Sequence, residues 1–342
     1  MKWLVGVVVF AVLAAGALFG VGYFVLPATS AVARTVEIDR PRSIIFPLLA
    51  NLRTFNEYSP WFDRDPKADY IFTGPRAGVG QTARWSSSVP AVGGGEQTIT
   101  AVTQSDEVRT KLVLHGAAAE SSWKLTAGRN GATAVTWTLS FPCGQAPESV
   151  ICRYVNIVNA ATMASQVDFG LQRLKKLAEE LPALDIEQLK PEFVTVSAQD
   201  FAYVEGETTQ DDAAVDAAIV QSLTTYVGPF LRQNGLTQAG PPLAVTTTWA
   251  NDKFAFRAGA PFQGAIPLVQ VGAKVGKTPG GQALKVTHTG PRASMRPVYA
   301  RIEAYMRANR LDQAGAPWEV FLDDPATPDQ AGRRTEIYFP IR

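Results

Sequence analysis

The sequence predicts an α+β protein in three parts: an N-terminal membrane helix, a helix-grip domain, in which a curved antiparallel sheet meets a long C-terminal helix, and a duplicated strand-helix-strand-strand domain. Three observations lead to this prediction: an uncharged apolar N-terminus, a strand-rich region that ends in a long amphipathic segment, and a motif that occurs twice. They place a transmembrane anchor at residues 1–27 and the two domains at residues 34–181 and 190–342.

Composition and charge limit the classes of function. The chain has 342 residues, of which 46% are hydrophobic and 18% charged, so it is long enough for two domains with cores of their own. Its 32 basic and 31 acidic residues leave a net charge of +1, and no run of Lys and Arg occurs. Such a chain has no field that would hold a polyanion, and we expect no nucleic-acid partner.

The first element is the anchor. No charged residue occurs from Trp3 to Leu26, a stretch long enough to span a bilayer as a helix. A cleaved signal peptide has a shorter apolar region, although Ala31-Val32-Ala33 offers a small-residue cleavage pattern. The length therefore favours an uncleaved anchor over a cleaved signal.

The orientation of the anchor depends on the charges at its two ends. Lys2 and the terminal amine compete with Arg34, Arg40 and Arg42 beyond the span. We favour a single-pass protein of the inner (cell) membrane with its N-terminus inside and its body on the periplasmic, extracytoplasmic side.

The second element is the strand-rich region. A strand is expected at residues 35–38 and a short helix from Pro41 to Leu52. Glycine-rich turns at residues 74–80, 92–96 and 128–133 then separate strands in the manner of an antiparallel meander. From Tyr154 to Leu181 the apolar residues recur every three or four positions, which predicts a long amphipathic helix. A sheet closed by such a helix leaves a cavity between them.

These residues resemble the polyketide cyclase and START-like (SRPBCC) superfamily over residues 34–181. The most specific parts are Ser59-Pro60-Trp61 with the following Asp65-Pro66, and the Thr-x-Val-x-Trp strand at residues 133–137; after Phe141 the segment with the two cysteines departs from the family. The resemblance implies a hydrophobic cavity for a lipid-like or polycyclic ligand and brings no universal catalytic residues. Four tryptophans either line this cavity or fill the core: Trp61, Trp85, Trp123 and Trp137.

The cysteines and histidines bear on redox state and metal binding. Cys143 and Cys152 are the only cysteines, and they either close a short disulfide loop in an oxidising compartment or are two buried thiols. The only histidines, His115 and His288, do not stand in ligand spacing with a cysteine pair. We expect neither a metal nor another cofactor.

The third element is the duplication. Residues 232–245 read RQNGLTQAGPPLAV and residues 307–320 read RANRLDQAGAPWEV, with eight identities at a constant offset of 75 positions. Two copies are too few for a solenoid and predict one domain with pseudo-twofold symmetry, whose seam can be hollow. Each copy has the order strand, helix, strand, strand; the second begins with a strand pair at residues 267–275 and 283–289.

The second half resembles the GyrI-like small-molecule-binding domain, also called the effector-binding domain, over residues 190–342. The resemblance rests on His288-Thr-Gly-Pro291, on Trp318-Glu319 followed by Asp324-Pro325, and on the closing residues 335–340. The chain departs from the family at Arg292, where an aromatic residue is usual. The resemblance implies a pocket for small molecules.

A comparison of the two copies suggests which strand face carries the pocket. Leu243 and Val245 match Trp318 and Val320, so this apolar face is expected to pack on the helix. The opposite face differs between the copies and gains Glu319 beside Phe321, which makes it the candidate for ligand contact. The predicted ligand-binding residues are Tyr203, Glu205, Trp249, Phe254, Phe256, Glu319, Phe321 and Tyr338.

A carboxylate ringed by aromatic residues is costly to ionise unless a positive charge reaches it. A hydrophobic or cationic small molecule is therefore the expected partner, with its rings on the aromatic residues. Alternatively, Glu319 lies on the surface and pairs with Arg333 or Arg334.

Three functions remain open. The favoured one is a membrane-anchored small-molecule-binding protein without catalytic residues. The alternative is a hydrolase or cyclase in which Glu319, or Glu205 with Tyr203, performs acid-base chemistry. The third is a scaffold in an envelope complex.

Overall fold

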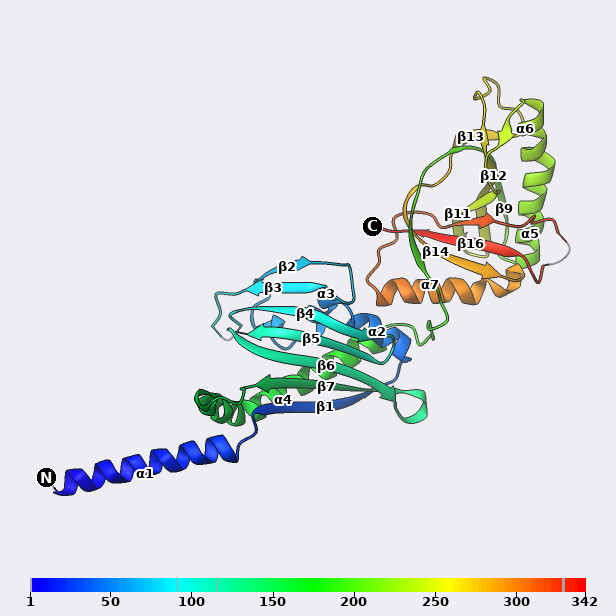
Figure 1. Ribbon diagram of the computed structural model, residues 1–342. Coiled ribbons are helices and arrows are strands. Elements are labelled where there is room, and N and C mark those ends of the chain that lie inside the picture. Colours follow the sequence, from blue (N-terminus) through cyan, green and yellow to red (C-terminus); the bar gives the residue numbers. More distant parts are fainter. Residues whose placement is uncertain (1, 91, 115, 328–329) are drawn as a thin grey trace. The chain divides into compact units, whose positions relative to one another are not determined.

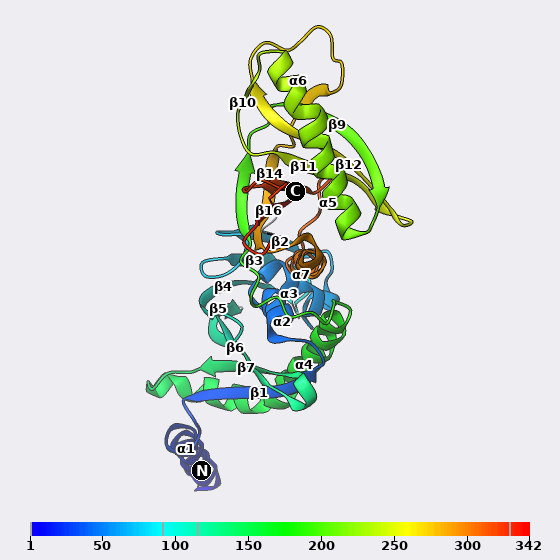
Figure 2. The same ribbon diagram turned by 90° about the vertical axis from the view of Figure 1, so that its right-hand side faces the viewer.

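The computed structural model describes residues 2–90, 92–114, 116–327 and 330–342, so the expectation for His115 lies outside the described residues. The chain divides into two compact units, Met1–Glu187 and Gln188–Arg342, each with its own sheet (Figures 1 and 2).

The first unit begins with α1 (Lys2–Phe24), which projects from the sheet (Figure 1). Among the residues that the structure describes, Trp3–Phe24 is the one helix long and apolar enough to cross a membrane. Length and composition alone support this, and a signal sequence has the same properties. No residue in the most apolar stretch of this helix is buried against the rest of the protein.

The sheet of the first unit is antiparallel throughout and has the order β1-β7-β6-β5-β4-β3-β2. Its strands are β1 (Thr29–Ile38), β2 (Asp69–Thr73), β3 (Thr82–Ser86), β4 (Gly94–Thr103), β5 (Glu107–Leu114), β6 (Ala117–Ala127) and β7 (Thr133–Pro142). The helices are α2 (Arg42–Leu49), α3 (Leu52–Tyr58) and the long α4 (Val150–Glu179), which runs along β1 (Figure 1). The predicted helix-grip arrangement is therefore confirmed.

Two of the four tryptophans fill the core of this unit. Trp123 and Trp137 are each 1% exposed and stack with their ring centroids 5.3 Å apart. The indole nitrogen of Trp137 donates to Ser121 Oγ at 2.7 Å. This bond satisfies the polar atom of a ring that is otherwise surrounded by apolar side chains.

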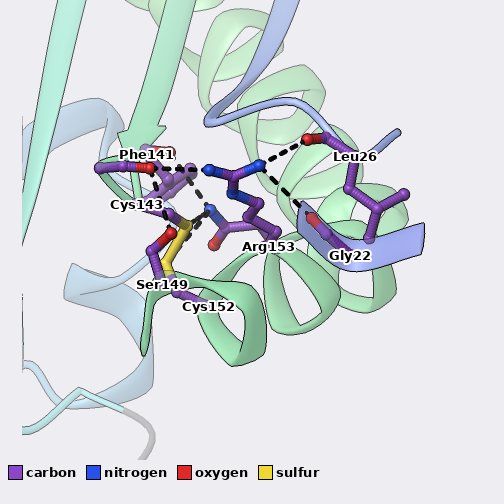
Figure 3. Close-up of a disulfide and its surroundings, with 9 residues drawn as sticks. Gly22, Leu26, Phe141, Cys143, Ser149, Cys152 and Arg153 are labelled. Carbon is purple, nitrogen blue, oxygen red and sulfur yellow. Dashed lines mark hydrogen bonds between the residues drawn. A yellow bond between two sulfur atoms is a disulfide. The ribbon is translucent and has the colours of Figure 1, made fainter. Parts of the chain in front are cut away.

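The end of α1 is fixed to the start of α4. Cys143 and Cys152 form a disulfide across the β7–α4 connection. Next to it, the buried guanidinium of Arg153 donates to the carbonyls of Tyr23 at 2.8 Å and of Gly144 at 3.1 Å. It also donates to the carbonyls of Leu26 at 3.1 Å and Gly22 at 3.4 Å, as Figure 3 shows. The last carbonyls of a helix have no partner within it, so Arg153 satisfies groups that α1 leaves open.

The second unit has one sheet with the path β13-β9-β12-β11-β15-β16-β14-β8, and β10 pairs with β12 beside that path. Its strands are β8 (Glu192–Val196), β9 (Asp200–Thr209), β10 (Thr237–Gln238), β11 (Leu243–Ala250), β12 (Lys253–Gln263), β13 (Lys274–Lys277), β14 (Gly281–Thr289), β15 (Trp318–Phe321) and β16 (Arg334–Pro340). The first helical segment comprises α5 (Asp212–Gln221), a π-helical turn (Ser222–Val227) and α6 (Gly228–Gln233), end to end (Figure 2); the second is a 3-10 turn (Arg292–Ser294) followed by α7 (Arg296–Ala308).

The duplication appears as a pseudo-twofold axis between β11 and β15. Leu243 pairs with Val320, Ala244 with Glu319 and Val245 with Trp318. Ala244 and Glu319 occupy the same position in the two copies, so the axis passes between them. Local hydrogen bonds repeat as well: Gln238 Nε2 donates to Gly240 O at 2.8 Å, and the equivalent Gln313 bond measures 2.7 Å.

The helices cover the face opposite to the expected one. Ala244, Phe256 and Phe321 pack with Val215 and Ile219 of α5. The residues expected beneath the helix lie on the other face, in a cluster that includes Leu243, Val245, Trp318 and Tyr338. Both faces are apolar here, so side-chain alternation separated the two faces correctly but could not show which one the helices cover.

The strand expected at residues 267–275 is also different. The structure has only β13 (Lys274–Lys277) there. The preceding loop, with Gly264 and Gly272 at positive φ, exposes the apolar side chains of Leu268 and Val271. Gly272 lies inside the expected segment, and its positive φ departs from the extended backbone of a strand, so one strand cannot run through residues 267–275.

Candidate ligand-binding sites

A cavity of about 430 Å³ lies at the seam of the second unit, on the helix side of the central strands. It is bordered by β11, β12, β15 and β16, by the start of α5, by the 3-10 turn before α7 and by α7 itself. Its lining residues are Asp212, Thr246, Trp249, Phe254, Arg292, Met295, Arg296, Tyr299, Ala300, Glu303, Gln313, Pro317, Glu319 and Phe339. We call it the seam cavity. Its volume is in the range of small-molecule sites.

Glu319 forms part of the seam cavity wall and is 3% exposed. Its Oε1 accepts from Arg292 Nη1 at 3.1 Å and from the Tyr299 hydroxyl at 2.8 Å, and its Oε2 accepts from Arg292 Nη2. The positive charge that this buried carboxylate requires is therefore supplied by the protein itself, from Arg292. The surface alternative for Glu319 does not hold.

Arg292 belongs to a chain of alternating charges. Its Nε donates to Asp216 Oδ1 at 2.7 Å, and Asp216 Oδ2 accepts from Arg333 Nη2, also at 2.7 Å. We call Arg333, Asp216, Arg292 and Glu319 the buried charge network. Two cations and two anions make it neutral in sum, which is how buried charges are usually accommodated.

The network also sets the protonation of its neighbours. Burial by itself lowers the pKa of Arg292, but the carboxylates of Glu319 and Asp216 outweigh burial and raise this pKa overall. Burial and then the charge of Glu319 raise the pKa of the Tyr299 hydroxyl well above its usual value. Tyr299 therefore remains a protonated donor, and Arg292 remains a cation, at every physiological pH.

The polar rim of the seam cavity lies beside an aromatic wall. Arg296 pairs with Asp212 at 3.2 Å, and its guanidinium carbon lies 5.6 Å from the centre of the Trp249 ring. Trp249 in turn meets Phe254 edge to face, with centroids 5.4 Å apart. Trp249 is 46% exposed, so the wall reaches from the buried charge network to solvent.

Three of the eight predicted site residues lie on this cavity: Trp249, Phe254 and Glu319. Phe256 and Phe321 are buried against α5. Tyr203 and Tyr338 lie on the sheet face that the helices leave free. Glu205 is exposed and pairs with Lys274 at 2.6 Å and Arg257 at 3.3 Å, which hold its pKa below the usual value.

Sequence reasoning missed the contributions of α7. Arg292, Met295 and Tyr299 line the cavity because the 3-10 turn and the first turns of α7 lie over β15. One signal was available: Arg292 stood out as a departure from the family. The pairing of Arg292 with Glu319 could be predicted only if the helices were known to cover the sheet face that carries Glu319.

A second cavity, of about 400 Å³, lies between the sheet and α4 of the first unit. We call it the grip cavity. Its walls are mainly apolar and include Trp61 and Trp85. The other lining residues are Leu52, Phe55, Asn56, Ser59, Arg64, Tyr70, Ala83, Val92, Gln97, Leu112, Leu114, Ala117, Phe141, Val155, Asn159, Met163 and Gln166.

One polar group on the wall of the grip cavity is unsatisfied. Gln166 is 7% exposed, and its Oε1 accepts no hydrogen bond from any of the described residues. By contrast, Gln97 donates to Thr110 Oγ1 at 3.0 Å. A buried acceptor without a donor is uncommon in folded proteins and is satisfied readily by a ligand that carries one. No cluster of metal-binding side chains occurs among the described residues.

The two halves match two families. Residues 29–179 match the family described as polyketide cyclase / dehydrase and lipid transport, and residues 159–342 match the GyrI-like small molecule binding domain. The two matches overlap within α4. No curated protein sequence matches the chain.

Solved structures resemble parts of the chain. The C-terminal domain of EcmrR is 16% identical, with a TM-score of 0.39, and the match covers 45% of this chain and 98% of that chain. A hydrolase from Listeria innocua is 16% identical, with a TM-score of 0.31 and coverage of 45% and 92%. Truncated norcoclaurine synthase from Thalictrum flavum is 12% identical, with a TM-score of 0.35 and coverage of 45% and 96%.

Proposed function

The chain belongs to the family of GyrI-like small-molecule-binding domains, and on this premise we propose that it is a membrane-anchored receptor for an amphipathic small molecule, which it binds in the seam cavity. The observation that carries the proposal is the combination of an aromatic wall with a buried carboxylate that is already neutralised.

The charge of the wall decides the kind of ligand. A cationic group that approached Glu319 would have to displace Arg292, which also binds Asp216 and is itself buried. Breaking a buried pair of this kind costs about 3–5 kcal/mol. An uncharged ring system can instead lie between Trp249 and Tyr299 without disturbing the pair, with its polar end at the rim near Arg296.

Two probes of equal shape and opposite charge test this proposal. Tetraphenylphosphonium and tetraphenylborate, with triphenylphosphine oxide as the neutral compound, are titrated against the full chain in detergent by isothermal calorimetry. We expect the neutral compound to bind the wild-type protein more tightly than the phosphonium. In Arg292→Met the order is expected to change, because Glu319 then lacks a cation and attracts the phosphonium.

The matched control is Arg334→Met, which removes an exposed arginine of the same unit. It should leave all three affinities unchanged. Binding of none of the probes in the wild type, or a phosphonium preference that is equal in wild type and Arg292→Met, would count against the proposed site.

An enzyme is the second candidate, and one contact favours it. The Tyr299 hydroxyl and Glu319 Oε1 lie 2.8 Å apart on the cavity wall, so a proton donor stands beside a carboxylate. Against it, Arg292 occupies both oxygens of Glu319 and competes with any proton transfer to them. Turnover of an ester or lactone that Tyr299→Phe abolishes without loss of binding would establish the hydrolase or cyclase.

For the location, we infer that α1 spans the inner membrane once and that the body lies outside the cytoplasm. The Cys143–Cys152 disulfide supports this side, because disulfides persist in oxidising compartments. Alkylation in intact cells tests it: both thiols should react with maleimide only after reduction. Reaction without a reductant would place the body in the cytoplasm.

A further inference from the structure

The first half of α4 carries an exposed apolar stripe. Ile151, Val155 and Val158 are 75%, 50% and 77% exposed and follow one another at spacings of four and three, which puts them on one face of the helix. No charged residue occurs between Arg153 and Asp168. Single exposed apolar residues are ordinary, but a contiguous uncharged stripe indicates a surface that is covered by something.

The stripe begins where α1 ends. Arg153 binds the carbonyls of Tyr23 and Leu26, and the Tyr154 hydroxyl donates to Leu18 O at 2.8 Å. Gly22 packs so closely on α4 that a Cβ there would lie 2.4 Å from Val150. At a rise of about 1.5 Å per residue, Val158 lies only about 7.5 Å along α4 from Arg153. If α1 crosses a bilayer, the stripe therefore starts at the bilayer surface.

The grip cavity lies beside the same stripe. Its exposed lining residues include Val155 and Asn159 of α4 and Ala117 of β6. The strand register puts Ala117 at the sheet end where β1 begins, because Glu120 pairs with Ser140 and Thr29 pairs with Pro142. Val155 belongs both to the stripe and to the cavity wall. One exposed part of the grip cavity wall thus lies next to the apolar stripe and near the end of α1.

We propose that the stripe of Ile151, Val155 and Val158 rests in the lipid–water interface, and that the grip cavity opens onto the membrane and takes its ligand from it. The inference rests on the proposed membrane anchor. The ligand class follows from the wall: an apolar chain or ring system that dissolves in lipid and carries one hydrogen-bond donor, such as a hydroxyl group, for Gln166 Oε1. The clamp at Arg153 and the disulfide fix α4 against the end of α1, which holds the stripe at this depth.

Depth measurements in nanodiscs test the position of the stripe. The full chain is spin-labelled at Val158→Cys, or at Thr126→Cys as the control, since Thr126 is exposed near the other end of β6. Collisions of the label with oxygen, which concentrates in lipid, are compared with collisions with a water-soluble nickel chelate. We expect the label at 158 to favour oxygen by at least threefold over the label at 126.

The outcomes separate the inference from its premise. If alkaline carbonate extracts the chain from the membrane, α1 does not span the membrane and the proposed anchor is wrong. If it remains in the membrane but the label at 158 meets the nickel chelate as often as the label at 126, the stripe faces water and only this inference is overturned. Protection from both reagents together with broadening between labels would show a second copy of the chain on the stripe, and would also overturn it.

Ligand uptake is tested with a pyrene-labelled long-chain alcohol in vesicles. Transfer of the probe to the reconstituted protein should be at least tenfold slower in Val158→Glu than in wild type or in Thr126→Glu. Filling the cavity with Met163→Trp should abolish binding while the depth at residue 158 stays the same. Uptake at the wild-type rate in both Val158→Glu and Met163→Trp would refute the membrane-facing cavity.

Discussion

The ion pair of Arg292 with Glu319 is the feature on which the ligand preference depends, so its energy can be tested without any ligand. The two side chains are 7% and 4% exposed. Arg292→Met leaves Glu319 with Tyr299 alone and Asp216 with Arg333 alone. Removing one partner of a buried ion pair costs about 3–5 kcal/mol, and we expect a loss of this size in the unfolding free energy of the second unit.

Glu319→Gln should cost less, about 1.5–3 kcal/mol. The amide oxygen can still accept from Tyr299, and Arg292 keeps its bond to Asp216. In the double variant neither partner is left alone, so the cost should fall short of the sum of the single costs by about 2 kcal/mol.

Hydrogen exchange of β15 as a function of denaturant is the suitable assay, since it reports the second unit separately from the first. The control cycle uses Arg334→Met and Asp323→Asn, an exposed pair at 2.8 Å in the same unit, for which weaker coupling is expected. Coupling in the Arg292–Glu319 cycle that is no larger than in the control cycle would show that these two side chains do not stabilise the second unit as a buried ion pair.

Three further predictions concern stability. Burial lowers the pKa of His288, so the unfolded chain binds a proton at a higher pH than the folded protein does. The unfolding free energy should therefore fall as the pH drops below about 6.5. His288→Gln should flatten the pH dependence of the melting temperature between about pH 7 and pH 5. Cys143→Ser with Cys152→Ser opens a loop with a sequence separation of 9 and should cost about 2–3 kcal/mol in urea unfolding of the first unit; an unchanged midpoint would contradict this. A Cβ at Gly259 would lie 2.0 Å from the carbonyl oxygen of Ala202, so Gly259→Ala should lower the unfolding free energy of the second unit by about 1–3 kcal/mol. Gly235→Ala is the comparison for backbone strain, because Gly235 has a positive φ but no atom within 4 Å of its Cβ position.

Much of the architecture could be predicted from local pattern. The motif around Gln238 and Gln313 recurs with its hydrogen bonds, and the three-and-four spacing after Tyr154 became part of α4. Periodicity shows which side chains share a face. Which face the helices cover depends on long-range packing. The prediction that Leu243 and Val245 lie beneath a helix was therefore wrong.

The site was harder to predict than the fold for a related reason. Glu319 was singled out because it differs from Ala244, its counterpart in the first copy. Its partners come from the turn before α7 and from the helix itself, which are distant in sequence and whose position is set by packing against the sheet. The sequence around Glu319 does not show which cation pairs with its carboxylate. The prediction of a cationic ligand was made because the pairing with Arg292 could not be predicted.

The axis between Ala244 and Glu319 explains why this site suits a single fused chain. In a dimer of identical subunits every residue occurs in both, so an acid on the symmetry axis would lie directly across from itself, and like charges in opposed positions of neighbouring strands repel. Once both repeats are encoded in one polypeptide, each can diverge without its sibling. Alanine on one side then leaves room for a lone acid and its arginine on the other, an asymmetry that no homodimer could encode.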